Sequence, residues 1–352
     1  MKIGSIVLST NQGLGVLAKS FYDSGLVHEV LIKEHGTLKN HPEWFNHSPF
    51  IGNPSDSFAQ TKHPGVDERL IITNFLSKID VLLVFEIPFY FTIQTSDGRT
   101  VGYDILKDAK RLGVKTVLMP MYECTPYPME ADLYLCPSKL DYEVYKKMYP
   151  EANIKQVTIP VDVSWKQRTQ ANTFVYNAGN GGTNDRNGTR EVIESLQHIK
   201  SPIEMIIRSQ KPLDVNVNDS RVDVRIGTVE YDKLFLEGDV FLFPEKFNGL
   251  SLPLQEAYAS GMLVMTTDRF PNTLWLPNEP LIPVSGYVED RIVNVPFHRA
   301  TIDPINIANT IDLWYKKDIT KYSNQGKLWG EQHSWENMLP KYIQVIKEGL
   351  SQ

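Results

Sequence analysis

The stretch that decides the fold is residues 239–268, DVFLFPEKFNGLSLPLQEAYASGMLVMTTD. An apolar run at 239–244 predicts a buried strand, and a loop with one glycine follows it. The next segment, 253–260, predicts a helix that opens on proline, because proline lacks the N–H group that would have no partner in a first helical turn. A second apolar run at 262–266 predicts another buried strand. This strand–loop–helix–strand order is typical of a parallel sheet covered by helices.

The same order of apolar run, turn and amphipathic stretch recurs along the whole chain. It predicts an α/β protein with parallel sheets that carry helices on both faces. Pro150 and Pro160 enclose a segment with little apolar content, and we place a domain boundary there. The predicted parts are a Rossmann-like N-terminal lobe at 1–158, a Rossmann-like C-terminal lobe at 159–330 and a closing helix at 331–352. Because ligands of such sheets bind beyond the carboxyl ends of the strands, we expect a central cleft that both lobes face.

The composition excludes several classes of protein. The chain has 352 residues, 41% of them apolar, which is enough for a large core without disulfides or metal sites. Its two cysteines, Cys124 and Cys136, lack metal-ligand spacing and favour a reducing, cytoplasmic setting. The apolar runs are far shorter than the ~20 residues that cross a bilayer. The net charge of −6 argues against broad electrostatic binding to nucleic acid.

The loop before Pro253 is a candidate anion site. The backbone N–H groups of Gly249, Leu250 and Ser251 stand directly before a predicted helix, where free amides and the helix dipole attract a diphosphate. Glu256 lies one turn into this helix, where its carboxylate can accept hydrogen bonds from the two hydroxyls of a ribose. From the residues alone, the alternative is an ordinary strand–turn–helix unit with a glutamate on the helix surface.

This segment resembles the donor-binding motif of the retaining, nucleotide-sugar-dependent glycosyltransferases of family 4, which have the GT-B fold. The matching residues are Gly249-Leu250-Ser251-Leu252-Pro253 and Glu256-Ala257, with Ala259-Ser260-Gly261 after them. The resemblance implies that Glu256 holds the ribose and that the Gly249–Ser251 amides contact the donor. It extends over the second lobe, where the last helix is expected to cross back to the first lobe, and more loosely over the first lobe.

One residue departs from the family pattern. Asn248 stands eight residues before Glu256, where the first of the family's two glutamates is usual, and it carries no charge. We expect Asn248 to bond sugar hydroxyls as a catalytic and donor-binding residue, while the donor sugar and the retention of configuration stay open. Glu245, three residues earlier, is an alternative source of a carboxylate in the same space.

The family's diphosphate-binding arginine and lysine have no direct counterparts, because Asn187-Gly188 stands where a Lys-Gly pair is usual. Arg186 and Arg208 are the replacements that we expect to bind the donor. Arg208 ends a predicted strand, so its guanidinium would reach the cleft and stabilise the leaving diphosphate as a catalytic group. Either arginine could instead be an ordinary surface residue. The polar loop at 177–188, which follows the predicted strand at 173–176, contains Gly181, and we count this glycine among the donor-binding residues. Further along the chain, Tyr231–Glu237 is predicted to be helical.

Two glycines, Gly13 and Gly15, follow the first strand and open a helix. In the fold that the chain resembles, this loop faces the donor phosphates and the acceptor, and we count both glycines among the donor-binding residues. A tight turn that needs glycine is the alternative, because a lone G-x-G motif is not specific.

The acceptor side has no histidine where the family often places one, at the end of a central strand of the first lobe. The strand end at 80–85 offers Glu86 instead, and the next strand end is followed by Tyr122 and Glu123. We expect these three residues to face the acceptor, with Glu86 also catalytic. Each of them could equally be structural.

Together these features predict an enzyme that moves a hexosyl or pentosyl group from a nucleoside-diphosphate sugar, first of all a UDP-sugar, to a hydroxyl acceptor. We expect no metal and no cofactor besides this co-substrate, because the histidines form no ligand pattern. The acceptor is a glycan, a small molecule or a hydroxymethylated DNA base. Compact glycosyltransferases of bacteria and their viruses can use such a base as the acceptor. A non-catalytic binder of nucleotide sugar or glycan and a nucleotide-sugar epimerase are the alternatives.

Overall fold

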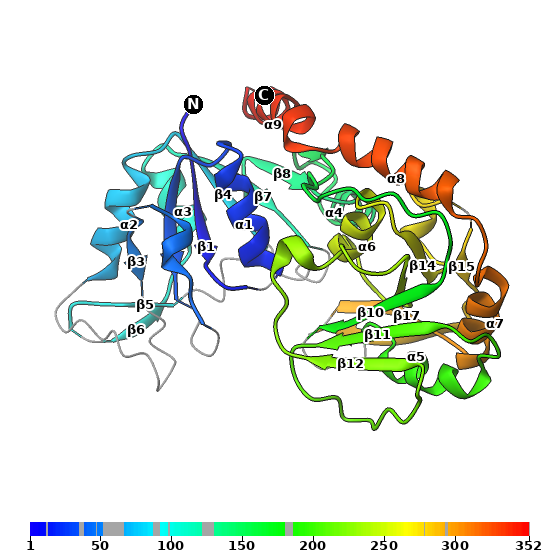
Figure 1. Cartoon of the computed structure of the whole chain (residues 1–352). Coiled ribbons are helices and arrows are strands. Elements are labelled where there is room, and N and C mark those ends of the chain that lie inside the picture. Colours follow the sequence, from blue (N-terminus) through cyan, green and yellow to red (C-terminus); the bar gives the residue numbers. More distant parts are fainter. Residues whose placement is uncertain are drawn as a thin grey trace. The chain divides into compact units, whose positions relative to one another are not determined.

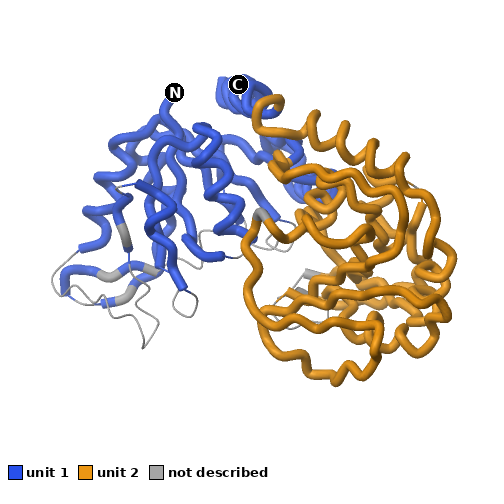
Figure 2. The backbone as a smooth tube through the Cα atoms, in the orientation of Figure 1, with its two compact units in different colours: residues 1–158, 338–352 blue, residues 159–337 orange. Residues whose placement is uncertain are grey.

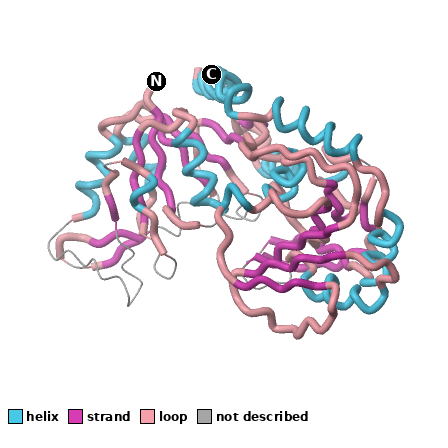
Figure 3. The backbone as a smooth tube through the Cα atoms, viewed as in Figure 1, coloured by secondary structure: helices cyan, strands magenta, loops and turns pink. Residues whose placement is uncertain are grey.

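The computed structural model describes residues 1–11, 13–34, 39–46, 48–51, 67–86, 92–97, 99–121, 130–179, 186–277, 279–292 and 295–351. The chain forms two compact units, one from Met1–Thr158 with Met338–Gln352 and the other from Ile159–Asn337 (Figure 2). Each unit contains a parallel sheet and helices that cover it (Figures 1 and 3). The predicted α/β class with two Rossmann-like lobes is therefore confirmed.

The sheet of the first unit has the strand order β3-β2-β1-β4-β7-β8-β9, and all its pairs are parallel. Its central strand β4 is a continuous apolar run, as expected where both faces of a sheet are covered. Helices α2 and α3 lie on one face and α1 on the other (Figure 1). The strands are β1 Ile3–Leu8, β2 Glu29–Lys33, β3 Phe50–Ile51, β4 Val81–Phe85, β7 Lys115–Met119, β8 Leu133–Cys136 and β9 Ile154–Gln156. The helices are α1 Gly13–Asp23, α2 Glu68–Leu76, α3 Ile105–Arg111, α4 Lys139–Met148 and α9 Trp335–Leu350, and β5 Thr92–Gln94 pairs with β6 Thr100–Gly102 as a hairpin.

Helix α9 brings the end of the chain back to the first unit. Its buried residues Met338, Tyr342 and Ile346 recur every four positions, so they share one face of the helix. The ring of Tyr342 packs edge-on against Phe21 with the centroids 5.3 Å apart, and its hydroxyl donates to the Thr158 carbonyl at 3.2 Å. The apolar face of α9 thus completes the core of the first unit. No helix in the described residues is long and apolar enough to cross a membrane.

The sheet of the second unit has the order β12-β11-β10-β13-β14-β15, again with parallel pairs. Helices α6 and α8 pack together on one face and α5 and α7 on the other (Figure 1). The strands are β10 Thr173–Gly179, β11 Glu204–Ser209, β12 Val222–Ile226, β13 Val240–Phe243, β14 Leu263–Thr267 and β15 Leu281–Ile282, with a separate hairpin of β16 Gly286–Ile292 and β17 Val295–Thr301. The helices are α5 Thr189–Ser195, α6 Leu252–Ala259, α7 Pro304–Trp314 and α8 Thr320–Gln332.

The helix predicted at Tyr231–Glu237 is wrong. The structure has only the short 3-10 turn η6 at Tyr231–Lys233. The carbonyls of Tyr231 and Lys233 accept from amides three residues later, Leu234 at 3.2 Å and Leu236 at 3.4 Å, and not four residues later as in an α-helix. The carbonyls that follow accept from distant side chains, since Arg208 donates to Leu234 and Arg168 to Phe235. Side-chain donors from other elements therefore satisfy the carbonyls where the short turn ends.

Candidate functional site

The loop after β13 is organised around the side chain of Glu245, which is 0% exposed. Its Oε2 accepts hydrogen bonds from Asn248 Nδ2 at 3.1 Å and from Ser251 Oγ at 2.6 Å. Its Oε1 accepts from Arg269 Nη2 at 2.5 Å and from Asn272 Nδ2 at 3.0 Å. Four donors thus satisfy a buried carboxylate, as burial of a charge requires. These contacts give Glu245 a structural role, to fix the path of the loop.

Two of the predicted donor-binding residues lie side by side here: Asn248 belongs to this loop, and Arg186 reaches it from the segment before α5. Asn248 Oδ1 accepts from Arg186 Nη2 at 3.0 Å and from the Ser251 backbone N–H at 3.2 Å. The Arg186 guanidinium also donates to the Phe247 carbonyl at 3.2 Å and lies 5.1 Å from the centroid of the Phe247 ring. Arg186 is half-buried, so a positive charge stands beside the amides of the loop.

In the turn before α6, the amides of Gly249 and Leu250 have no acceptor in the described part of the chain, and neither does the amide of Leu252, the first residue of the helix. Ser251, the residue before the helix, has φ 48° and ψ 54°, a left-handed conformation that costs a non-glycine residue about 1 kcal/mol. Its side chain does not cap the helix, because the hydroxyl donates to Glu245. The bonds of Asn248 and Glu245 therefore hold a strained turn from which two N–H groups can bind an anion.

Glu256 is buried one turn into α6, with 7% of its surface exposed. The hydroxyl of Tyr231 donates a hydrogen bond to its Oε1. Burial raises the pKa of Glu256 to about 7, and the bond from Tyr231 acts in the opposite direction. Tyr231 also lines a pocket of about 80 Å³ with Asp162, Val163, Ser164, Phe235 and Leu236. The carboxylate predicted to hold a ribose thus lies in the interior of the unit rather than on an open helix surface.

Arg208 lies at the end of β11 and is 4% exposed. Its guanidinium donates to the Leu234 carbonyl and, at 2.5 Å, to Glu237 Oε2. Glu237 accepts a second hydrogen bond from Arg225 at 2.7 Å. These contacts hold Arg208 against the segment that follows η6, and a contact with a donor diphosphate stays a prediction.

In the first unit, the two glycines differ in their surroundings. Gly13 is the exposed first residue of α1, and a Cβ there would meet no atom within 4 Å. A Cβ on Gly15 would lie 2.0 Å from the Thr10 carbonyl oxygen and 2.8 Å from that of Leu8. Gly15 is therefore required by the close packing of α1 on the turn after β1, which agrees with the tight-turn interpretation.

Glu86 follows β4 with φ 57°, and its N–H donates to the Met119 carbonyl at 2.9 Å. It is half-buried at the carboxyl end of a central strand, as the sequence predicts. The other predicted residues, Gly181, Tyr122 and Glu123, lie outside the described residues.

Two residues of this site have no role in the sequence-based prediction, Tyr231 and Arg269. Arg269 follows β14 and ion-pairs with Glu245, although 24 residues separate them. Tyr231 reaches Glu256 across 25 residues. Neither pair has a local pattern that could indicate it, because each depends on how the strands are ordered in the sheet.

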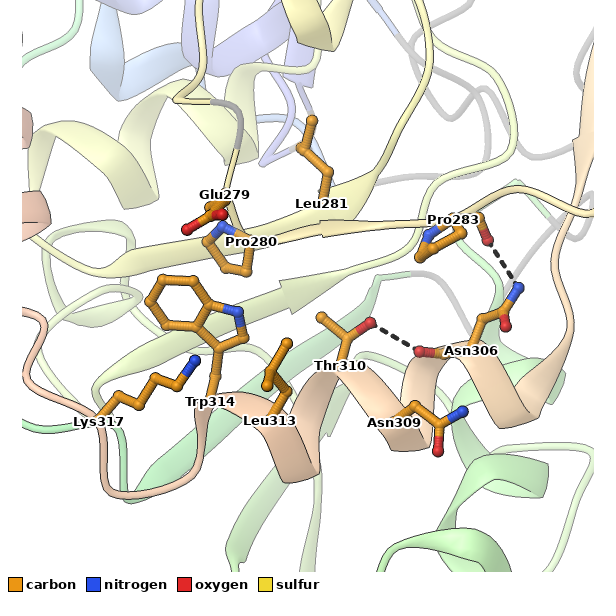
Figure 4. Close-up of a pocket in the computed structure, with 10 residues that line it drawn as sticks. All are labelled: Glu279, Pro280, Leu281, Pro283, Asn306, Asn309, Thr310, Leu313, Trp314 and Lys317. Atoms are coloured by element: carbon orange, nitrogen blue, oxygen red, sulfur yellow. Dashed lines mark hydrogen bonds between the residues drawn. The ribbon is translucent and has the colours of Figure 1, made fainter.

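A larger pocket, of about 420 Å³, lies between β15 and α7 (Figure 4). Pro280, Thr310 and Trp314 form part of its wall, and Lys317 Nζ lies 4.7 Å from the centroid of the Trp314 ring. None of the predicted site residues lines this pocket.

No protein-family model matches the sequence, and no curated protein matches it either. Solved structures do match over nearly all of the chain. HepE of Anabaena, in complex with UDP and glucose, has a TM-score of 0.67 at 11% identity and covers 99% of this chain and 100% of its own. A glycosyltransferase from Rickettsia africae has a TM-score of 0.65 at 13% identity, with 99% and 98% covered. Sucrose-phosphate synthase from Thermosynechococcus elongatus has a TM-score of 0.61 at 11% identity, with 99% and 98% covered. The chain therefore has the predicted GT-B fold.

Proposed function

We propose that this protein is a glycosyltransferase that moves a sugar from a nucleoside-diphosphate sugar to a hydroxyl acceptor. The observation that carries the proposal is the turn before α6, where the amides of Gly249 and Leu250 stand one helical turn from the buried carboxylate of Glu256. In a nucleoside diphosphate the ribose is bonded directly to the diphosphate, so one donor molecule would meet both groups. HepE, which shares the fold, has been solved with UDP-glucose, and this supports a UDP-sugar as the donor.

In this proposal the diphosphate binds to the amides of Gly249 and Leu250. The positive end of the α6 dipole favours a negative charge there. Arg186, held by Asn248, adds a guanidinium beside the same turn. Charge that develops on the leaving diphosphate is thereby stabilised by groups that are already in place, which is the main electrostatic task in glycosyl transfer. Glu256 accepts the two ribose hydroxyls and fixes the nucleoside.

We further propose a retaining, metal-independent transfer of the family 4 type. The bond from the anomeric carbon to the diphosphate breaks, and the acceptor oxygen attacks from the face that the diphosphate leaves. Its proton passes to the departing diphosphate, so no strong protein base is required. Asn248 uses one N–H of its side-chain amide for Glu245, and the other can donate to a sugar hydroxyl. On the acceptor side we propose Glu86, Tyr122 and Glu123.

The test is donor turnover. The protein is incubated with a panel of UDP- and GDP-sugars, with and without a glycan, a small sugar or hydroxymethylated DNA, and the released nucleoside diphosphate is measured. We expect one donor to be turned over, and faster with one acceptor class than without it. No release and no binding with any donor would contradict the proposal.

A non-catalytic binder is the second candidate, and the state of Asn248 favours it. Both polar atoms of this side chain bond to neighbours, at the place where a glutamate is usual in the family that the chain resembles. The same experiment separates the two functions. A rise in melting temperature with a donor, without turnover on any acceptor, would identify the binder.

A further inference from the structure

We infer that Tyr231 is a positioning residue that holds Glu256 for the ribose, and that Arg208 acts on the site through Tyr231 rather than on the diphosphate. This inference rests on the proposed function, since it assigns Glu256 to the nucleoside of the donor.

The first observation concerns the hydrogen bonds that orient the Glu256 carboxylate. Within the described residues, the Tyr231 hydroxyl is the only group that hydrogen-bonds to the Glu256 carboxylate. A carboxylate offers about four acceptor positions, so this bond leaves room for two ribose hydroxyls. Burial and the neighbouring carboxylate raise the pKa of Tyr231 well above its usual range, so the hydroxyl keeps its proton and stays a donor. Tyr231 therefore fixes the orientation of the Glu256 carboxylate and leaves most of its hydrogen-bond acceptor positions open.

The second observation is how Tyr231 itself is held. It belongs to the short turn η6, which makes few bonds of its own, and the segment behind it is fastened by two buried arginines. Arg208 donates to the Leu234 carbonyl, and Arg168 donates to the Phe235 carbonyl.

The same two arginines hold the end of this segment. Arg168 Nε donates to the Gly238 carbonyl at 3.1 Å, and Arg208 Nη2 donates to Glu237 at 2.5 Å. The two guanidiniums thus fix the backbone that directly follows η6, from Leu234 to Gly238, and with it the turn that carries Tyr231. Loss of Arg208 would let this backbone move, and the Tyr231 hydroxyl would move with it.

The third observation concerns charge. A ribose with two donor hydroxyls needs Glu256 ionised, and burial works against ionisation by raising the pKa of this carboxyl to about 7. The hydrogen bond from Tyr231 favours the ionised form. Burial and the Tyr231 hydrogen bond are the causes that shift the pKa of Glu256, while the Asp162 carboxylate helps to raise the pKa of Tyr231. Without the Tyr231 hydroxyl, the pH at which nucleotide binding is half lost should therefore rise.

The first experiment measures nucleotide affinity against pH. UDP and GDP are titrated calorimetrically between pH 5.5 and 8.5 into the full chain, and the tighter ligand is kept. We expect Tyr231→Phe to bind this nucleotide about tenfold more weakly at pH 7.5. The pH at which binding is half lost should move upward. The KM for the donor should rise, while kcat stays nearly unchanged. The exposed Tyr287→Phe is the control and should bind as the unmodified protein does. An unchanged affinity and midpoint in Tyr231→Phe would overturn the inference and leave the proposed function standing.

The second experiment separates the two roles of Arg208. The chosen diphosphate and its bare nucleoside are compared by NMR titration in Arg208→Gln and, should that variant fold poorly, in Arg208→Lys. If Arg208 acts through Tyr231, both ligands weaken by the same factor, and adding Tyr231→Phe weakens them no further. If only the nucleoside diphosphate binds more weakly and the bare nucleoside does not, Arg208 contacts the diphosphate directly, and the inferred role through Tyr231 is overturned. Absence of all nucleotide binding by the unmodified chain would instead overturn the proposed function, and this inference with it.

Discussion

The side-chain amide of Asn248 donates a hydrogen bond to the buried carboxylate of Glu245 across 3.1 Å. On its other side, the Asn248 oxygen accepts from Arg186 and from the Ser251 amide. Only a side chain that both donates and accepts can satisfy these three neighbours. A glutamate in this place would bring a second carboxylate against Glu245. Asparagine rather than glutamate at this position therefore suits the buried carboxylate three residues earlier in the chain.

We predict that Asn248→Glu destabilises the protein by about 2 kcal/mol at pH 8, because it places two carboxylates side by side in a buried loop. Urea denaturation of this variant, of Glu245→Gln and of the double variant measures the coupling between the two positions. The double variant should be more stable than the sum of the single losses, since one of the two charges is then gone. Strict additivity would show that the two side chains do not interact.

We predict that Glu256→Gln is more stable than the unmodified protein at pH 8 and differs little from it at pH 5. The folded-state pKa of Glu256 is about 7 against an ordinary 4.5, so the folded protein binds the proton more tightly than the unfolded chain. Stability is then lost as the pH rises from about 4.5 to about 7, by about 3 kcal/mol in all. Urea denaturation at the two pH values measures this difference. The exposed Glu194→Gln on α5 is the control, and an equal response of both variants to pH would contradict the prediction.

We predict that Gly15→Ala destabilises the protein far more than Gly13→Ala does. At position 15 the new methyl group would overlap the Thr10 carbonyl, and the distortion should cost about 3 kcal/mol. At position 13 the space is open at a helix start, so alanine should change the stability by less than about 1 kcal/mol. Thermal denaturation compares the two variants. Equal stability would refute the close packing of α1 on its turn.

The strand–loop–helix unit around α6 could be predicted from sequence because its signals are local. The apolar runs at 239–244 and 262–266 correspond to β13 and β14, and the predicted helix at 253–260 differs from α6 by one residue at each end. The pairing of Asn248 with Arg186 joins two residues that the sequence had already singled out.

Other parts of the fold depend on contacts between distant segments and could not be predicted in this way. Helix α8 has few apolar residues and contains Gly326 and Gly330, and glycine is a poor helix former. A Cβ on Gly326 would lie 2.1 Å from the Tyr258 carbonyl oxygen, so α8 needs glycine to approach α6. The contact of Tyr231 with Glu256 likewise depends on two buried arginines that hold the Tyr231 segment, and no local pattern encodes it.

The most direct test of donor capture is a calorimetric titration of UDP at pH 8 into the unmodified chain and into Glu256→Ala and Glu194→Ala. We predict one bound UDP per chain, an affinity reduced about 10- to 100-fold in Glu256→Ala through the loss of charged hydrogen bonds, and no change in Glu194→Ala. UDP bound by Glu256→Ala as tightly as by the unmodified chain would contradict the claim that this carboxylate holds the donor.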